Sequence, residues 1–305
     1  MSGLGDREAA IHLPVLIEEV AFLLRPRRGG WVVDGTIGMG GHAERLLEQA
    51  DAATRLLGID GDPEALARAG RRLARFGSRV TLRQGSFRDL AAHASATGAT
   101  EARTILLDLG LSSYQLDESG RGFSFSGDEP LDMRFDPSRG RTAAEVLNTA
   151  SEDELARLLA EYGEERHARR IARRVVEARA RRPLARTAEL VEVVKRGVPR
   201  AAWSRRIHVA TRTFQALRMA VNEELPALSE ALPQAAALLA PGGRLGVISF
   251  HSGEDRIVKR TFRALAGEGY APLEPAPIQP EQDEINHNPR ARSAKLRVIE
   301  RLEGA

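Results

Sequence analysis

Short apolar runs and longer amphipathic stretches alternate between residues 30 and 110. The apolar runs have the length of β-strands and end at turn residues: Trp31–Asp34, Arg55–Asp60, Arg79–Gln84 and Thr104–Leu109. Helical spacing of apolar residues lies between them, at His42–Ala50, Pro63–Phe76 and Phe87–Ala96. Such an alternation predicts a parallel sheet with crossover helices.

The alternation stops after the fourth predicted strand and resumes near residue 222. Residues 111–140 are rich in Gly, Ser, Asp and Pro and are predicted to be loop, whereas residues 142–220 show only helical patterns. A helix over 222–239, a turn at Pro241–Gly243, a strand at Arg244–Phe250, a helix at Gly253–Leu265 and a last strand at Ala294–Arg301 then follow; 14–24 is a further predicted helix and 271–283 a loop. We therefore predict an α/β domain formed by residues 1–112 and 216–305, with an all-helical insertion at 113–215.

Composition limits the kind of protein this is. The chain has 305 residues, of which 42% are hydrophobic, enough for a sizeable core. It contains no cysteine, which excludes disulfides, thiolate metal sites and a thiol nucleophile, and its seven histidines are scattered. The N-terminus lacks a signal pattern, and no apolar run approaches the ~20 residues of a membrane span. We expect a cytoplasmic protein with no metal and no membrane association.

Positive charge is concentrated in one part of the chain. The net charge is only +3, yet residues 164–218 hold 16 Lys or Arg against 5 Asp or Glu. Such a segment predicts a polyanionic partner. Five arginines at helical spacing are expected to form a face for phosphates: Arg166, Arg169, Arg170, Arg173 and Arg174. The alternative is a solvated face paired with acids such as Glu164 and Glu165. Weaker candidates for phosphate contact are Arg121, Arg134, Arg212, Arg218 and Lys295.

The first predicted strand ends in Asp34, and a glycine-dense turn leads from it into the next helix. Glycine lets the backbone approach a ligand closely, and the helix offers unpaired N–H groups. Asp60 ends the next strand, where an acid can bind ribose hydroxyls. The pattern Gly38-Met39-Gly40-Gly41-His42-Ala43 indicates a nucleotide-like cofactor. By itself it fits both NAD and S-adenosylmethionine (SAM).

Nine sequence blocks extend the picture beyond this loop. They are His12-x-Pro14-Val15-Leu16, Asp34-Gly35-Thr36-x-Gly38-x-Gly40-Gly41-His42, Gly58-x-Asp60-x-Asp62-Pro63, Asp108-Leu109-Gly110-Leu111-Ser112-Ser113-x-Gln115-Leu116-Asp117, Arg121-Gly122-Phe123-Ser124-Phe125, Pro130-Leu131-Asp132-Met133-Arg134, Thr213-Phe214-Gln215-Ala216-Leu217-Arg218, Ser249-Phe250-His251-Ser252-x-Glu254-Asp255-Arg256 and Asn288-Pro289-x-Ala291-Arg292-Ser293-Ala294-Lys295-Leu296-Arg297. Together, and in this order, they resemble the bacterial small-subunit ribosomal RNA cytosine-N4 methyltransferases.

The resemblance implies a class I SAM-dependent methyltransferase fold (Rossmann-like) with a helical insertion after the fourth strand. It implies SAM as the cofactor and the exocyclic N4 of a cytidine in the decoding region of 16S rRNA as the acceptor. Free rRNA and the small ribosomal subunit both remain open as substrates, and so do a monomer and a homodimer. Thr36 occupies the place where many SAM loops carry their first glycine.

Site residues follow from the resemblance and from their positions. The backbone of Gly40, Gly41 and His42 is expected to hold the methionine end of SAM, and the His42 ring is free to lie in solvent. Asp60 is expected to bind the ribose hydroxyls, since an ionised carboxylate only accepts hydrogen bonds; a helix cap is the alternative. Phe87 is expected to pack on adenine, or else in the core. Asp108 and Gln115 are expected to contact SAM.

The catalytic assignment rests on Asp108, Ser113 and His251. Cytosine N4 is a weak nucleophile, and an acceptor for its hydrogens would hold it in line with the methyl group. Asp108 and the hydroxyls of Ser112 and Ser113 are candidates, whereas His251 has a contact with the base or a structural role as alternatives. An NAD-dependent oxidoreductase, a non-enzymatic RNA-binding factor and a DNA methyltransferase are the competing functions.

Overall fold

A computed structural model describes residues 14–26, 29–204 and 207–304 of the chain. His12, which opens the first matching block, lies outside the described residues. The chain forms two compact units. The first contains the described residues up to Asp60, Glu64–Gly110 and those from Glu230 onward, and the second contains Gly61–Pro63 and Leu111–Ser229. The helical unit thus takes in residues 216–229, which the sequence prediction assigned to the α/β domain.

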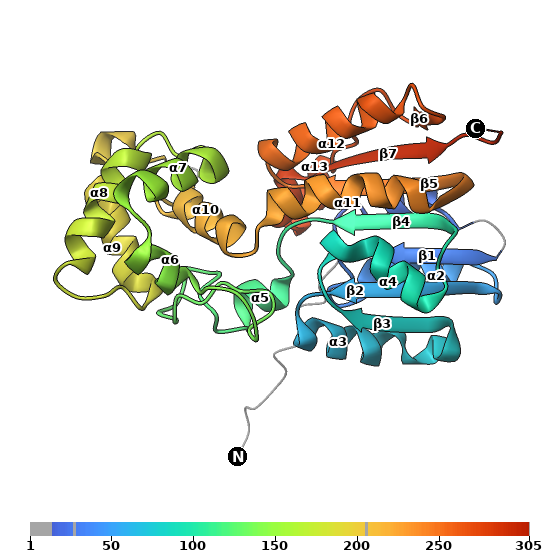
Figure 1. The fold of residues 1–305 in the computed structure, drawn as a ribbon, viewed down its shortest axis with the longest axis horizontal. Helices are drawn as coiled ribbons and strands as arrows, with labels where there is room; N and C mark the ends of the chain where they lie inside the picture. The colour runs from blue at the N-terminus through green and yellow to red at the C-terminus, as the bar shows by residue number, and fades with distance from the viewer. Residues whose placement is uncertain (1–13, 27–28, 205–206, 305) are drawn as a thin grey trace, which may run out of the picture. The chain divides into compact units, whose positions relative to one another are not determined.

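The first unit is built on a seven-stranded sheet (Figure 1). Its strands are β1 (Gly30–Asp34), β2 (Thr54–Asp60), β3 (Val80–Gln84), β4 (Ala102–Asp108), β5 (Leu239–Ser249), β6 (Tyr270–Pro272) and β7 (Lys295–Arg301). They lie in the order β3-β2-β1-β4-β5-β7-β6. The first five strands in that order are parallel, and β7 runs antiparallel to both β5 and β6. The parallel α/β sheet predicted from the sequence is confirmed.

Helices cover the sheet. They are α1 (Ile17–Leu23), α2 (Gly41–Gln49), α3 (Pro63–Leu73), α4 (Leu90–Thr97), α11 (Glu224–Leu238), α12 (Ser252–Leu265) and α13 (Gln282–His287). Leu16, Leu46 and Leu73 pack with Val32 and Leu56 of the strands in one apolar cluster. On β4, Ile105, Leu106 and Leu107 are fully buried, as expected for a parallel strand covered on both faces.

Three details of this unit differ from the sequence prediction. Pro241, Gly242 and Gly243 do not form a turn before β5 but lie inside it, at an irregularity where Ala102 pairs with Leu239 and Thr104 with Arg244. Gly242 has a φ of 70°, which suits such an irregularity. The segment predicted as loop at 271–283 contributes to β6 and to the start of α13. Both are short, and short elements leave no hydrophobic period to detect.

The second unit has a helical core, as predicted. Its helices are α5 (Ser113–Asp117), α6 (Ala143–Thr149), α7 (Glu152–Gly163), α8 (Ala168–Arg179), α9 (Thr187–Gly197) and α10 (Thr211–Val221). Leu155, Leu159, Ile171, Leu190 and Leu217 are among the residues of one buried cluster. Figure 1 shows these helices gathered together. Among residues 14–26, 29–204 and 207–304, no helix is both long enough and apolar enough to cross a membrane.

The segment predicted as loop at 111–140 is more ordered than its composition indicates. It contains α5, which Ser112 caps by accepting a hydrogen bond from the amide of Gln115 at 3.2 Å, while the side chain of Gln115 accepts one from Ser112 N at 3.0 Å. This is a capping box with glutamine as its third residue, a signal that the sequence contained. Further along, Pro130 forms a β-bridge with Arg186.

Candidate cofactor-binding site

Three carboxylates stand at the carboxyl ends of neighbouring strands. Asp34 ends β1, Asp60 ends β2 and Asp108 ends β4. β1 pairs with β2 on one side and with β4 on the other, so the order of the strands along the chain reverses at β1. In open α/β sheets, ligands bind at such a switch point, outside the carboxyl ends of the strands. The sheet therefore places a candidate site where the sequence analysis expected one.

The glycine loop after β1 has the backbone that close ligand approach requires. Gly38 and Gly40 have φ values of 50° and 82°, in the left-handed region where residues with a Cβ are strained. A Cβ at Gly41 would lie 2.4 Å from Cγ of Pro14. Gly40 caps α2, and the first amides of a helix have no partner within the helix. The amides of Gly41 and His42 are therefore suited to a ligand carrying negative charge.

Thr36 links this loop to β4. Its hydroxyl accepts a hydrogen bond of 2.6 Å from the backbone N–H of Asp108, and its own N–H donates to Oδ1 of Asp34 at 3.1 Å. A glycine, which many SAM loops carry at this position, has no side chain to make the first contact. The departure seen in the sequence thus has a structural role, because it fixes the backbone of Asp108 relative to the loop.

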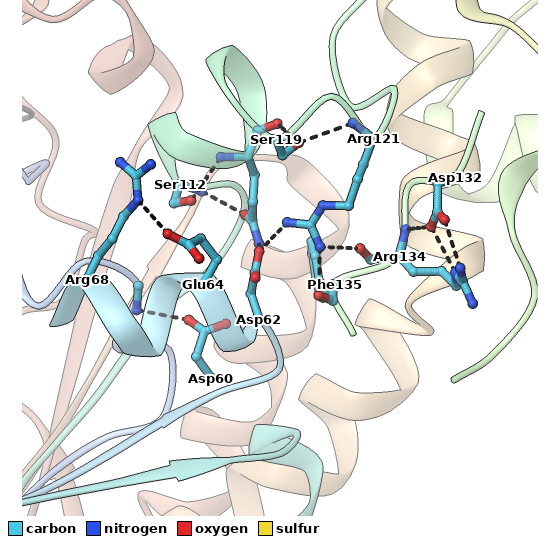
Figure 2. A network of polar contacts seen from close by, with 12 residues as sticks. Asp60, Asp62, Glu64, Arg68, Ser112, Ser119, Arg121, Asp132, Arg134 and Phe135 are labelled. Atoms are coloured by element: carbon cyan, nitrogen blue, oxygen red, sulfur yellow. Dashed lines mark hydrogen bonds and ion pairs between the residues drawn. The ribbon is translucent and has the colours of Figure 1, made fainter. Parts of the chain in front are cut away.

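Asp60 is held by the same loop. Its Oδ2 accepts a hydrogen bond from the backbone N–H of Gly38 at 2.9 Å, which Figure 2 shows. Asp60 is half-buried at the end of β2. That placement suits the binding of ribose hydroxyls, and it also ties the second strand to the glycine loop.

The ring of His42 does not lie in solvent, which was the alternative to a role in the site. His42 is only 6% exposed, and its Nε2 lies 3.5 Å from Oδ2 of Asp108. Neither ring nitrogen has a hydrogen-bond partner among the described residues, and neither does Oδ1 of Asp108, although all three atoms are buried. The ring reaches β4 because α2 begins at the end of the loop after β1, and β1 is the neighbour of β4 in the sheet. Unpaired buried polar atoms are rare in native proteins and call for an explanation.

Asp34 is a site residue that the sequence analysis missed. It was recognised as the end of the first strand but given no role. It is 1% exposed, and this burial raises its pKa to about 7. His42 and the hydrogen bond from Thr36 oppose the rise in pKa, whereas the nearby carboxylates of Asp108 and Asp60 add to it. Perturbed carboxyl groups of this kind cluster at functional sites.

The other predicted residues of the first unit take different places. Phe87 begins a 3₁₀ turn after β3 and is half-buried, with its Cβ close to Gly35. His251 caps α12: its Nδ1 accepts a hydrogen bond from Glu254 N at 3.3 Å, and its Nε2 lies 2.9 Å from Oε1 of Glu254. That arrangement gives His251 a structural function, while its proposed contact with the substrate stays a prediction.

Two predicted residues belong to the second unit. Ser113 is the first residue of α5, and its side chain lies outside the described part of the structure. Gln115 is buried, and its Nε2 donates to Oδ2 of Asp62 at 3.4 Å. Asp62 also receives the guanidinium of Arg121, which donates to the carbonyl of Phe135 as well (Figure 2). Gln115 is therefore an organising residue of the segment after β4, in addition to any contact with a cofactor.

Several weak candidates for phosphate contact are engaged within the protein. Arg121 is paired with Asp62, Arg134 with Asp132, Arg218 with Glu224 and Lys295 with Asp255. Figure 2 shows the first two pairs. An arginine held by a carboxylate in this way has its charge compensated locally. These residues are better explained as structural cations than as a surface for a polyanion.

The arginines of α8 and the turn before it behave differently. Arg166, Arg169, Arg170, Arg173 and Arg174 are all exposed. Arg174 pairs with Glu177 at 2.6 Å, whereas the other four have no ion pair with any described residue. Glu165, one of the acids expected to neutralise them, is buried and accepts a hydrogen bond from the amide of His167 instead. The face is thus largely uncompensated positive charge.

The chain is similar to known proteins over nearly its whole length. An rRNA methylase from Streptococcus thermophilus has a solved structure that aligns with a TM-score of 0.46 and 13% identity, covering 98% of this chain and 100% of that one. Proteins named ribosomal RNA small subunit methyltransferase H are 48% identical in Heliobacterium modesticaldum, over 95% of this chain and 98% of the relative, and 50% identical in Syntrophotalea carbinolica, over 97% and 99%. The profile of the MraW methylase family matches residues 9–302. The chain belongs to the MraW methylase family.

Proposed function

We propose that this chain methylates the exocyclic N4 of a cytidine in the decoding region of 16S rRNA. It is a SAM-dependent methyltransferase of class I fold. The relatives at 48–50% identity carry the name of a small-subunit rRNA methyltransferase, which supports rRNA as the substrate. The choice of N4 and of the decoding region rests on the resemblance of the sequence blocks. The observation that carries the proposal is the group of buried polar atoms without a hydrogen-bond partner on His42, at the start of α2, and on Asp108, at the end of β4.

The residues at the switch point fit SAM. Gly38 and Gly40 have left-handed backbone, which residues with a Cβ rarely adopt. Oδ1 of Asp108 and both ring nitrogens of His42 are buried without a hydrogen-bond partner among the described residues. In our proposal the amides of Gly41 and His42 hold the methionine end, and Gly40 shapes the turn before them, because its own N–H donates to the carbonyl of Ile37 at 2.8 Å. Asp60 binds the ribose, while Phe87 packs on adenine. Gln115, next to Asp62 in the network of α5, completes the set.

The reaction requires the protein mainly to align the N4 amine with the methyl group. When bound, SAM supplies a methyl group that is open to in-line attack. The lone pair of N4 is delocalised into the cytosine ring, so a hydrogen-bond acceptor on its hydrogens would localise that pair and orient the amine. Asp108 is our candidate for this acceptor, since it ends β4 at the switch point with one buried oxygen unpaired. Ser113 and His251 remain secondary candidates.

The test of the reaction is nucleoside mass spectrometry of 16S rRNA from cells with and without the gene. N4-methylcytidine should disappear without the gene and be restored by the wild-type chain but not by Asp108→Ala. We expect the variant to lower turnover by at least about 100-fold, because the amine loses its acceptor. An unchanged N4-methylcytidine level in the deletion strain would reject the proposal. Disappearance of a different modified nucleoside, or of one in DNA, would reassign the substrate.

The exposed arginines supply the proposed RNA contact. Backbone phosphates bind such a face mainly through charge, and affinity then falls steeply with salt. The variant Arg169→Gln/Arg173→Gln should weaken binding of 16S rRNA and reduce the slope of log K against log salt by about 0.7 for each phosphate that is no longer bound. Arg71→Gln, which removes an exposed arginine of α3, is the matched control. Equal slopes for both variants would show that the α8 face is not part of the interface.

Because N4 takes part in base pairing, the target cytidine must be unpaired or extruded before transfer. This favours a single-stranded or locally opened segment as the acceptor. Methylation assays with free 16S rRNA, with assembled small subunits and with a short duplex would separate these substrates. A duplex that is methylated as fast as single-stranded RNA would contradict this requirement.

A further inference from the structure

The buried imidazole of His42 lowers the stability of the protein unless its ring takes part in the function of the site. Binding of a cofactor through the backbone N–H of residue 42 needs no particular side chain, because every residue but proline has that group. Yet His42 places a polar ring at a position that is 6% exposed, with no hydrogen bond to either nitrogen. Burying an unpaired polar group costs free energy, and an apolar side chain of similar size would avoid that cost. The ring itself must therefore contribute to the site.

The geometry of the ring identifies its neighbour. Nε2 of His42 faces Oδ2 of Asp108 at 3.5 Å, slightly longer than a good N–H···O bond. The backbone of Asp108 is fixed by Thr36, whose hydroxyl accepts its N–H. Its other oxygen, Oδ1, is buried and unpaired. In sites without substrate, functional hydrogen bonds are often long, and they tighten in the complex. The ring therefore faces Oδ2, the oxygen on the accessible side of a side chain that is 27% exposed, whereas Oδ1 is enclosed by the protein.

We propose that His42 is a positioning residue for Asp108: its Nε2–H donates to Oδ2 and holds this accessible oxygen toward the substrate amine. This rests on the function proposed above and adds the residue that sets the orientation of the acceptor. Asp108 touches the reacting amine in this scheme, whereas His42 acts only through Asp108. His42 is not the base in this scheme, because the proton of the amine passes to Asp108.

The transfer balances with these groups. The lone pair of N4 forms the new N–C bond while the C–S bond breaks and its electron pair stays on sulfur. The amine then carries one positive charge and two hydrogens, one of which passes to Oδ2 of Asp108. The carboxylate becomes neutral, and the methylated N4 keeps its second hydrogen. A hydrogen bond from His42 to Oδ2 holds this oxygen on the path of the departing proton.

Asp34 is the competing partner for the ring. The acids that face this part of the site are Asp34 on β1, Asp60 on β2 and Asp108 on β4, and Asp34 interacts electrostatically with His42. If the ring served mainly to compensate Asp34, removing the charge at position 34 would change the state of the imidazole, while removing that at position 108 would not. The two possibilities can be separated by measuring the ring directly.

Substitution of His42 gives the kinetic test. The amide of His42→Gln can donate from a position similar to Nε2, whereas His42→Phe keeps a ring without a donor. We expect kcat to fall about 10- to 100-fold in His42→Phe, as for other residues that orient a reacting group. In His42→Gln, kcat should stay within a few-fold of the wild-type value. The Kd for SAM, measured by calorimetry, should change little in both, because the backbone amide remains.

Two results would overturn the inference: equal kcat for the wild type and His42→Phe, or a His42→Gln variant no better than His42→Phe, with melting temperatures unchanged. The substrate need not be known in advance, since any methylated product gives the ratio of kcat values. Failure of the proposed function would appear instead in the wild type, as a product other than N4-methylcytidine.

The second measurement does not depend on turnover or on a His42 variant that folds. Long-range ¹H–¹⁵N spectra of the imidazole report which ring nitrogen carries the proton. In the SAM-bound wild type we expect the Nε2–H form, and we expect Asp108→Asn to change the Nε2 signal more than Asp34→Asn does. The opposite ranking would assign the ring to Asp34 and refute the proposal.

Discussion

Asp34 and Asp62 are both about 1% exposed, yet their hydrogen-bond and ion-pair partners differ sharply. In the second unit, Asp62 receives the guanidinium of Arg121 and the amide of Gln115, and Arg121 directs other donors to backbone carbonyls (Figure 2). In the first unit, Asp34 accepts the backbone amide of Thr36, has no ion pair with any described residue, and interacts with His42, whose ring nitrogens have no hydrogen bond to described residues. A completed network, in which the buried polar groups have partners within the protein, stabilises the structure. An uncompleted network, in which some of them lack partners, can bind a ligand.

The largest effect is expected from breaking the completed network. Arg121→Met should lower the free energy of unfolding of the second unit by about 3–5 kcal/mol, because a buried carboxylate is left without its cation. The chain has two tryptophans, Trp31 in the first unit and Trp203 in the second. In a Trp31→Phe background, urea unfolding followed by fluorescence of Trp203 reports on the second unit.

A double-mutant cycle gives the control for Arg121. If the destabilisation comes from the uncompensated charge, adding Asp62→Asn to Arg121→Met should recover most of the stability. Additive effects of the two substitutions would mean that Arg121 acts through its packing on Phe123, over whose ring it lies, and not through Asp62.

The next effect concerns Asp34, in the uncompleted network of the first unit, and it depends on pH. The pKa of Asp34 is about 7 in the folded protein and about 4 when unfolded. Between these values the folded state binds more protons, so the free energy of unfolding falls as pH rises. Three pKa units correspond to about 4 kcal/mol at most. Asp34→Asn should abolish this fall, and Trp31 fluorescence in a Trp203→Phe background measures it between pH 5 and 8.

An opposite outcome for Asp34 is readily recognised. A variant that parallels the wild type across this range would show that Asp34 is ionised at low pH in the folded protein. Asp128→Asn, at an exposed acid of the second unit whose pKa is lowered by Arg186, is a control that should leave the pH dependence of Trp31 unfolding unchanged.

The smallest effect is expected at Thr36. Thr36→Val keeps the shape of the side chain but removes the acceptor for the N–H of Asp108, which should cost about 1 kcal/mol of stability. The relative loss in kcat should exceed the relative loss in the free energy of unfolding, because the backbone that carries the Asp108 carboxylate is no longer fixed. Thr36→Ser, which keeps the hydroxyl, should retain both. If Thr36→Ser is as slow as Thr36→Val, the methyl group and not the hydroxyl matters.

The sequence was sufficient to predict most strands and helices of the sheet and the carboxylates at the strand ends, but not the contacts that these carboxylates make. The strands and helices of the sheet follow from hydrophobic period, and the positions of Asp60 and Asp108 at strand ends follow from the same runs. The short elements α5, β6 and α13 left no period to detect, although Ser112 and Gln115 signalled a capping box.

What could not be predicted is which polar groups meet. The partnership of Asp62 with Arg121 spans 59 positions in the chain and depends on how the segment after β4 folds back. The inward turn of the His42 ring depends equally on tertiary packing. Local patterns carry no information on either, so the sequence could not show that Arg121, Arg134 and Arg218 pair with carboxylates.

The connection between β4 and β5 has a consequence for the history of the fold. The two strands are hydrogen-bonded neighbours, and α11 alone suffices as the crossover that a parallel pair requires. Most of the second unit, Leu111–Ser229, is thus inserted into this one connection. Such an insertion can be exchanged for one that recognises another polymer while the sheet stays intact. Laboratory grafting of foreign recognition modules would have its natural junctions at Gly110 and Glu230.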